Sequence, residues 1–512
     1  MFASRFLMVF SAWLWFFLPV LLVHFNLGSV GYFVLSAVLF WPLVCWRWSR
    51  LLVLSFLLLL GVANFVHIGF YGYLLDEFFL ATAQRTNWHE VLEFSYSIAP
   101  KIWFLTLAWL LGCVVAVRIV WRFAPHWQQL RWSQARGGLV VCVAAFFVWF
   151  LAGIWGVNKQ LSAAEFIYSI RPVYPMHFVQ AEVRQQKMQD DVFYIPELPK
   201  VQPEKAEFET IVLVLGESAS ASHWSLLGYR GESTNQALLG IDNLSVGRVM
   251  AHGPNTAAAF PFLLTGLSAL DSVEQRAPSI LDLAKNVAGY KTFVFTNSRF
   301  NDSQEDFYTQ ALRRASDVYQ KVGDGALDAV LTDAFVSALQ DAAPKKLIIL
   351  HTYGSHPKLE LRYPSGEYTS ADDYDNSIHY SSDLLAQWIG LTQAHSKDHP
   401  ALFLYTSDHG LAGPPCAPTY SHANNPESLE VPLLVWRSTA GRAQQASVVE
   451  QSANALGQAD VWYSNVLVPK MALQAMGLGA LAGKAPWNVA DHPEHDGLPW
   501  AQARKRQFCE LV

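Results

Sequence analysis

The stretch Ile211-Val212-Leu213-Val214-Leu215-Gly216-Glu217-Ser218 decides the fold, because five apolar residues run directly into a glycine, a carboxylate and a hydroxyl. A short, continuously apolar run is typical of a strand that is buried on both faces of a parallel sheet. Further candidate strands of this kind lie at 292–295, 346–350, 402–405 and 431–436. Helical patterns such as 279–287 and 381–391 lie between them, so we expect an α/β domain with a largely parallel sheet.

Polar side chains follow four of these strands at the point where each strand ends. They are Glu217 and Ser218 after the first, Thr296-Asn297-Ser298 after the second, His351 and Gly354-Ser355-His356 after the third, and Ser407-Asp408-His409-Gly410 after the fourth, with His422 further on. Ligands of open α/β sheets bind just past the carboxyl ends of the strands. One polar residue there is usually an ordinary loop residue, but four strands that end this way favour a functional site.

Glutamate, aspartate and histidine together are the ligands of a divalent cation such as zinc, and four-coordination leaves room for one more. A hydroxyl in that position would be activated as a nucleophile. The loop His252-Gly253-Pro254-Asn255-Thr256 is followed by small residues, so a helix could begin there and offer its amides to a phosphate. Three hydroxyls compete for the role: Thr256, Ser218 and Ser220. Taken alone, Thr256 is better explained as a helix N-cap.

The amino-terminal third of the chain is more apolar than the rest and consists mostly of long apolar stretches. Only 15% of the 512 residues are charged, against about 25% in an ordinary soluble protein. Crossing a bilayer takes about 20 mostly apolar residues in a helix. Five stretches meet or approach this length: 6–25, 30–46, 51–75, 102–117 and 137–157. We therefore expect a five-helix transmembrane domain at 1–157, an interfacial helix and linker at 158–205, and a catalytic domain at 206–512. A net charge of −6 gives no indication of nucleic-acid binding.

Basic residues predict the orientation, since they accumulate on the cytoplasmic side of a membrane. With the N-terminus inside, seven arginines lie in the cytoplasm: Arg5, Arg47, Arg50, Arg118, Arg122, Arg131 and Arg136. Only Arg85 and Lys101 then lie outside. Five spans that start inside place the catalytic domain outside the cytoplasm, where Cys416 and Cys509 could form one disulfide.

These motifs resemble the bacterial phosphoethanolamine transferases, membrane-anchored enzymes of the alkaline-phosphatase/sulfatase superfamily. The resemblance covers almost the whole chain. It is carried by Val214-Leu215-Gly216-Glu217-Ser218, Ser225-Leu226-Leu227-Gly228-Tyr229, Thr256 five residues before Pro261, Gly354-Ser355-His356-Pro357, Arg362-Tyr363-Pro364, Tyr374-Asp375-Asn376, Ser407-Asp408-His409-Gly410 and Val431-Pro432-Leu433-Leu434-Val435-Trp436.

The resemblance implies a role for each matching residue. Zinc would be held by Glu217, Thr256, Asp408 and His409, with Thr256 as nucleophile. His356 and His422 would contact phosphate or transfer protons. Asn297, with Arg299, would hold the phosphoethanolamine group. Thr86 and Glu90 would grip the lipid headgroup in the periplasmic loop, where Thr82 stands in place of the usual asparagine.

The implied reaction takes phosphoethanolamine from phosphatidylethanolamine and passes it to an envelope acceptor at the outer face of the bacterial inner membrane. Members that modify lipid A usually carry several disulfides, so lipopolysaccharide core or another envelope glycan is expected as acceptor alongside lipid A. Other interpretations are a phosphoglycerol transferase similar to lipoteichoic-acid synthase, and a non-catalytic lipid-binding sensor. A true sulfatase needs a Cys-x-Pro-x-Arg frame, whereas Cys416-Ala417-Pro418-Thr419-Tyr420 ends in tyrosine.

Overall fold

The computed structural model describes three long segments of the amino-terminal region and most of the α/β domain. These are residues 2–19, 47–71 and 100–123, with the positions 21, 33, 36–38, 40–41, 74–75, 80, 83, 98, 174 and 178, and then 197–266, 278–297, 312–397, 399–414, 420, 422, 426–439 and 463–482. The chain divides into two compact units, one within residues 1–188 and the other containing everything described from residue 197 onward.

The first unit contains the helices α1 (Phe2–Leu14), α4 (Arg47–Tyr71) and α7 (Pro100–Phe123) and a 3-10 turn, Trp15–Phe17. Within the described residues, two helical stretches are long and apolar enough to cross a membrane, Ser49–Ile68 and Pro100–Phe123. They coincide with the expected spans at 51–75 and 102–117.

The other expected spans are described only in part. Most of 30–46 and all of 137–157 lie outside the described residues, and the span at 6–25 is represented by α1 and the turn after it. The number of five spans therefore stays a prediction. On α7 large apolar side chains such as Phe104 (70% exposed) and Leu111 (62%) face outward, as they would in contact with lipid.

The second unit is built on one mixed sheet. Its described strands are β1 (Thr210–Gly216), β2 (Leu244–Met250), β3 (Lys291–Thr296), β4 (Val318–Lys321), β5 (Lys346–His351), β6 (Ala401–Ser407), β7 (Glu430–Arg437) and β8 (Tyr463–Ser464). They lie in the order β4-β3-β5-β1-β6-β7-β2-β8. The strands from β4 to β6 are parallel, whereas β7 is antiparallel to both β6 and β2. The five predicted strands all appear, each one to three residues longer; β2, β4 and β8 were not predicted.

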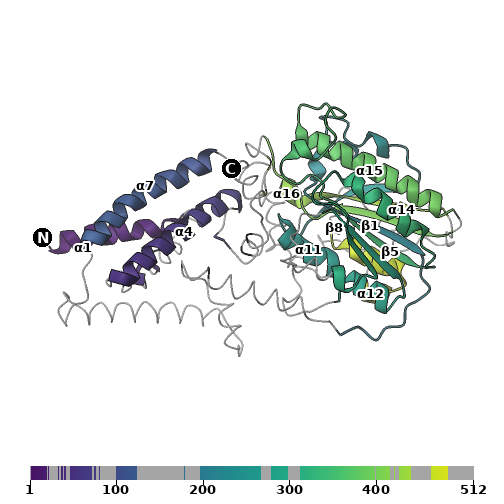
Figure 1. The fold of residues 1–512 in the computed structure, drawn as a ribbon, viewed down its shortest axis with the longest axis horizontal. Helices are drawn as coiled ribbons and strands as arrows, with labels where there is room; N and C mark the ends of the chain where they lie inside the picture. The colour runs from purple at the N-terminus through teal and green to yellow at the C-terminus, as the bar shows by residue number, and fades with distance from the viewer. Residues whose placement is uncertain are drawn as a thin grey trace. The chain divides into compact units, whose positions relative to one another are not determined.

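Helices cover both faces of this sheet (Figure 1). They are α11 (Thr256–Thr265), α12 (Ile280–Asn286), α14 (Thr332–Gln340), α15 (Asp373–His395), α16 (Pro426–Leu429), α18 (Leu467–Ala475) and α19 (Gly479–Ala482). The helical patterns predicted at 279–287 and 381–391 correspond to α12 and part of α15. The helices α14 and α15 lie on one face of the sheet, and α11 and α12 lie on the other.

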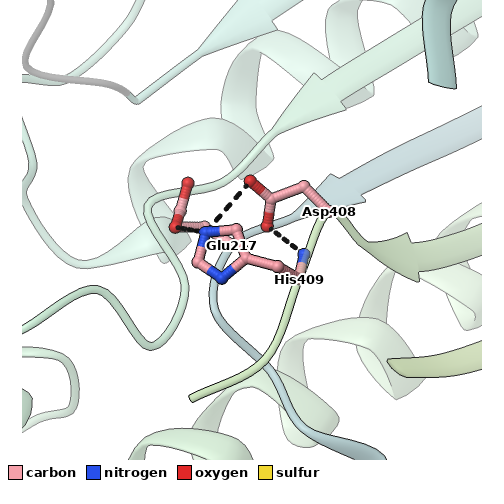
Figure 2. A group of neighbouring side chains, drawn as sticks. All are labelled: Glu217, Asp408 and His409. Atoms are coloured by element: carbon pink, nitrogen blue, oxygen red, sulfur yellow. Dashed lines mark hydrogen bonds and ion pairs between the residues drawn. The ribbon is translucent and has the colours of Figure 1, made fainter. Parts of the chain in front are cut away.

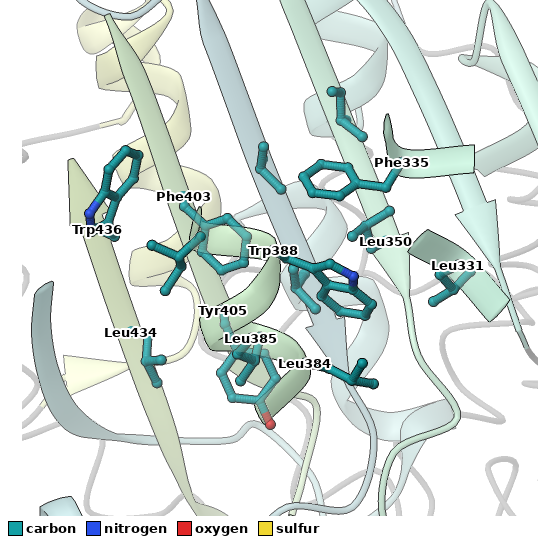
Figure 3. Close-up of a cluster of buried hydrophobic side chains, with 14 of the residues drawn as sticks. Leu331, Phe335, Leu350, Leu384, Leu385, Trp388, Phe403, Tyr405, Leu434 and Trp436 are labelled. Carbon is teal, nitrogen blue, oxygen red and sulfur yellow. The ribbon is translucent and has the colours of Figure 1, made fainter. Parts of the chain in front are cut away.

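A large hydrophobic core of this unit lies between the sheet and the pair α14 and α15. Figure 3 shows Phe335 and Trp388 from these helices against Phe403 and Trp436 from the strands, all nearly inaccessible to solvent. All seven residues of β1 are buried, so its side chains pack on both faces of the sheet. This two-sided burial explains the continuous apolar run in the sequence, and it holds the carboxyl ends of β1 and β6 in fixed positions.

Candidate metal centre and active site

The carboxyl ends of β1 and β6 bring three predicted metal ligands together. The two strands are parallel neighbours with Gly216 opposite Ser407, so Glu217 and Asp408 follow at the same level. His409 Nε2 lies 3.2 Å from Glu217 Oε1 and 3.5 Å from Asp408 Oδ2. Figure 2 shows the two carboxylates and the imidazole directed toward one another. We call Glu217, Asp408 and His409 the Glu217 cluster.

The hydrogen bonds of the Glu217 cluster leave metal-binding atoms available. Asp408 Oδ1 accepts from the backbone amides of Ser218 (3.2 Å) and His409 (2.7 Å). Asp408 Oδ2 is buried and accepts no hydrogen bond. His409 Nδ1 lies 2.9 Å from the carbonyl of Gly410, which keeps the proton on that nitrogen and directs Nε2 inward. A buried carboxylate oxygen without a donor is costly unless a cation occupies the space, so these residues fit a divalent metal.

The electrostatics of the cluster reflect two buried carboxylates beside one imidazole. Burial, together with the charge of Glu217, raises the pKa of Asp408 to about 7. Burial alone would lower the pKa of His409, but the two carboxylates raise it to about 9. Burial would raise the pKa of Glu217, yet its hydrogen bond and charge interaction with His409 outweigh this, so the net shift is downward. The cluster thus binds positive charge even when that charge is only a proton on His409.

Of the three candidate nucleophiles, Thr256 contacts two of the three ligands. It is the first residue of α11, and its Oγ1 donates to Glu217 Oε2 at 3.0 Å and lies 3.4 Å from His409 Nε2. Ser218 Oγ donates to Glu217 Oε1 at 2.7 Å. Ser220 Oγ instead accepts from the amide of Ser222 and lies 2.8 Å from the Ser222 hydroxyl. The geometry therefore leaves Thr256 and Ser218 in contact with the cluster and turns Ser220 away.

The two predicted additional histidines lie near this cluster. The His422 ring is 4.8 Å from the His409 ring, centroid to centroid. Burial and the charge of His409 lower the pKa of His422 to about 3. His356 stacks on Tyr353 with ring centroids 4.5 Å apart, and its charge lowers the pKa of Glu217. Both histidines are therefore within electrostatic reach of the ligands.

Asn297 makes hydrogen bonds within the protein, and its role as a substrate contact stays a prediction. Its Nδ2 donates to Asp328 Oδ1 (2.8 Å) and to the carbonyl of Ala326 (2.7 Å), and the residue is fully buried. Through these bonds the amide nitrogen of Asn297 supports the loop that contains Ala326 and Asp328. The remaining predicted substrate contacts, Thr82, Thr86, Glu90 and Arg299, lie outside the described residues.

Asp328 is a buried residue that sequence reasoning missed. Its carboxylate accepts from the amides of Tyr353 (2.7 Å) and Gly354 (2.8 Å) as well as from Asn297. It thereby fixes the loop after β5, whose Gly354 packs against the backbone of Glu217 so closely that an added Cβ would lie 2.5 Å from the Glu217 carbonyl oxygen. No motif marks Asp328, because its partners are backbone amides that are distant in sequence.

A second group of a histidine and two carboxylates lies nearby in the same unit. His223, Asp372 and Asp375, here called the Asp375 cluster, have ligand atoms within 4.8 Å of one another. Asp375 Oδ1 lies 2.7 Å from His223 Nδ1 and Oδ2 accepts from Tyr229 OH at 2.8 Å. Asp372 accepts from the Tyr374 amide (2.9 Å) and from the Tyr420 hydroxyl. Every carboxylate oxygen here has a donor, as expected of a structural cluster.

Comparisons with known proteins agree with this architecture. The chain is 32% identical over 243 residues to YhbX of Escherichia coli K12, covering 45% of this chain but only 43% of YhbX. It is 28% identical over 422 residues to the phosphoethanolamine transferase EptC of the same strain, covering 73% of this chain and 71% of EptC.

A solved structure extends the likeness to nearly the full chain. The integral membrane lipooligosaccharide phosphoethanolamine transferase A of Neisseria meningitidis superposes with a TM-score of 0.63 over 92% of this chain and 95% of that one, at 19% identity. At this identity the match concerns the fold. The sulfatase family model matches residues 209–466, which is just over half of the chain and includes every described strand of the sheet. The chain therefore belongs to the sulfatase family.

Proposed function

We propose that the protein transfers phosphoethanolamine from phosphatidylethanolamine to an envelope acceptor, lipopolysaccharide core or lipid A, through a phosphothreonine on Thr256. The observation that carries the proposal is the contact of Thr256 Oγ1 with both Glu217 and His409 in a buried cluster that has an unsatisfied carboxylate oxygen. The kinship with EptC, whose name states this activity, supports the choice of the transferred group.

The metal in this proposal is zinc. Two carboxylates, one imidazole nitrogen and one hydroxyl make a four-ligand set of the kind zinc accepts, and Glu217, Asp408, His409 and Thr256 would hold it. When bound, zinc lowers the pKa of a hydroxyl ligand and stabilises negative charge on phosphate.

In the first half of the reaction, Thr256 Oγ1 forms a bond to phosphorus and the bond from phosphorus to the diacylglycerol oxygen breaks. The threonine loses its proton, and the departing diacylglycerol oxygen takes one up. In the second half, an acceptor hydroxyl or phosphate attacks phosphorus, the Oγ1–P bond breaks, and phosphoethanolamine leaves on the acceptor. His356 and His422 are the residues near the ligands that can give and take these protons.

The remaining assignments complete the proposal. Asn297 and Arg299 would hold the ethanolamine phosphate, and Thr82, Thr86 and Glu90 would bind the donor headgroup. The amino-terminal domain at 1–157 would anchor the protein in the inner membrane by five helices, joined by the segment 158–205 to a periplasmic catalytic domain at 206–512. A membrane anchor suits a donor that itself resides in the bilayer.

The test replaces the proposed nucleophile in the full-length protein. Thr256→Ala should reduce diacylglycerol release from phosphatidylethanolamine by more than about a thousandfold, because a missing nucleophile cannot be replaced by binding alone. Three ligands remain, so zinc should still bind. Thr256→Ser keeps the oxygen and should keep partial turnover. The matched control is Ser220→Ala, which removes a nearby hydroxyl that faces away from the cluster.

Peptide mapping after incubation with labelled donor lipid should place phosphoethanolamine on Thr256. Label on Ser218, the other hydroxyl in contact with Glu217, would overturn the assignment of the nucleophile. Normal diacylglycerol release by Thr256→Ala would overturn the mechanism.

A further inference from the structure

A fully buried tyrosine hydroxyl joins the two loops that carry the metal ligands. Tyr374 OH donates to the carbonyl of Ser218 at 2.6 Å, one residue after Glu217. It accepts from the amide of Ser220 at 2.7 Å and from the amide of Leu411 at 3.3 Å, two residues after His409. A phenolic hydroxyl has one proton and two lone pairs, so its hydrogen-bonding capacity is completely used.

This bridge lies where the sheet no longer holds the two loops. The last backbone bond between them runs from the Asp408 amide to the Gly216 carbonyl, at 3.1 Å. Beyond this bond, the loop after β1 turns at Ser218. This residue has a φ of 60°, a conformation that a residue with a side chain rarely adopts. Such a conformation persists when the surroundings fix it, and Tyr374 fixes the carbonyl of that same residue.

The tyrosine ring is itself held firmly. It packs edge-on against His223, with ring centroids 4.7 Å apart, and at a tilt against Tyr420, with ring centroids 4.4 Å apart. Asp372 caps the start of α15 and accepts from the Tyr374 amide. The Asp375 cluster therefore surrounds Tyr374 and sets the position of its hydroxyl. Burial also raises the pKa of Tyr374, so the hydroxyl keeps its proton.

We propose that Tyr374 is a positioning residue that sets the distance between Glu217 and the pair Asp408 and His409, and thereby the metal affinity of the site. The identity of the metal as zinc rests on the proposed function. Removing the hydroxyl would leave the Ser218 carbonyl and two buried amides without partners, and the loops would relax at the expense of ligand geometry. Residues that orient metal ligands typically change metal affinity by about 10–100-fold when they are mutated.

The test compares two matched substitutions in the full-length protein purified in detergent. Tyr374→Phe removes one oxygen and keeps the ring contacts. Tyr290→Phe removes the hydroxyl of another buried tyrosine, which bonds the Phe208 carbonyl just before the opposite end of β1. Zinc dissociation constants are measured by competition with a chelator, and melting temperatures are recorded with and without zinc.

We expect Tyr374→Phe to weaken zinc binding by about 10–100-fold and to diminish the zinc-induced rise in melting temperature, while Tyr290→Phe keeps both at the wild-type level. At saturating zinc the kcat of Tyr374→Phe should remain below the wild-type kcat, because the ligand geometry is still altered. The KM for the donor should equal the wild-type KM. A wild-type zinc affinity in Tyr374→Phe, or an equal loss in Tyr290→Phe, would overturn the proposal. Zinc affinity does not depend on which group the protein transfers. If the wild-type protein released no diacylglycerol, the proposed function would be overturned, but a weaker zinc affinity in Tyr374→Phe would still support the role of Tyr374.

Discussion

The catalytic unit contains two clusters of the same composition, a histidine with two carboxylates, and they differ in how their oxygens are used. In the Asp375 cluster each carboxylate oxygen has a hydrogen-bond partner, supplied by His223, two tyrosine hydroxyls and a backbone amide. In the Glu217 cluster Asp408 Oδ2 is buried without a donor, and His409 Nε2 faces carboxylates. The first cluster has a donor for every carboxylate oxygen, whereas the second keeps an oxygen that a cation could contact.

The difference shows that residue type alone does not identify a metal site. Both clusters join distant segments, and both are within the spacing that a metal could bridge. What separates them is whether the ligand oxygens already have hydrogen-bond donors, since a carboxylate with donors gains little from a cation that would displace them. The two clusters are also connected, because Tyr374 packs against His223 and bonds the loop after Glu217. The Asp375 cluster thus supports the Glu217 cluster.

The largest expected effect comes from the same substitution made in each cluster. Asp408→Asn removes an anionic ligand and should weaken zinc binding by more than about a hundredfold, since even residues that only orient ligands cost about 10–100-fold. Asp375→Asn, the matched control, should retain zinc. It should lower the free energy of unfolding by about 1–3 kcal/mol, because an amide cannot accept from both His223 and Tyr229. Zinc content and urea unfolding of the full-length variants measure both quantities.

A loss of zinc in Asp375→Asn as complete as that in Asp408→Asn would break the comparison, because it would make the Asp375 cluster a metal site. Full zinc occupancy in Asp408→Asn would also contradict the comparison, because it would show that Asp408 is not a metal ligand.

A smaller effect should follow from crowding the loop behind Glu217. Gly354 has a φ of 47°, and a Cβ there would lie 2.5 Å from the Glu217 carbonyl oxygen. Gly354→Ala should therefore displace Glu217 and reduce turnover by about 10–100-fold, as a displaced ligand does. Gly366 is the matched control, with a φ of 84° and open space around it. The positive φ should cost each alanine variant about 1–2 kcal/mol of stability, and the collision with the Glu217 carbonyl adds a further loss in Gly354→Ala alone.

Diacylglycerol release and thermal unfolding separate the two contributions in these variants. Equal turnover in Gly354→Ala and Gly366→Ala would mean that the close approach to Glu217 has no bearing on the site.

The sequence predicted five of the described strands and the three residues of the Glu217 cluster because both depend on local signals. A continuous apolar run followed by Glu217, or by Asp408 and His409, places the ligand directly after its strand, and parallel neighbours align those ends. The Asp375 cluster and Asp328 were not predicted, since their partners, which include backbone amides, tyrosine hydroxyls and the side chains of His223 and Asn297, are brought together only by folding. The assignment of Asn297 as a substrate contact was made from resemblance, and its bonds to Asp328 and Ala326 depend on a loop that no local pattern encodes.

The smallest expected effect is a difference in how pH acts on the protein with and without zinc. In the metal-free state the pKa values of Asp408 and His409 are raised to about 7 and about 9, above the values of about 3.9 and 6.5 expected after unfolding. The folded state then binds more protons than the unfolded state at these two groups between about pH 4 and 9, so their contribution to stability falls as pH rises through this window. The lowered pKa of Glu217 acts in the opposite direction, and only at acidic pH.

Zinc requires the deprotonated ligands and binds more tightly as pH rises. The zinc-induced increase in melting temperature should therefore grow from pH 6 to pH 8.5, whereas His422, whose pKa is lowered to about 3, stays neutral over this range and should not contribute. An increase that is constant across this range would show that protons and zinc do not compete for the Glu217 cluster, and the contrast with the Asp375 cluster would lose its physical basis.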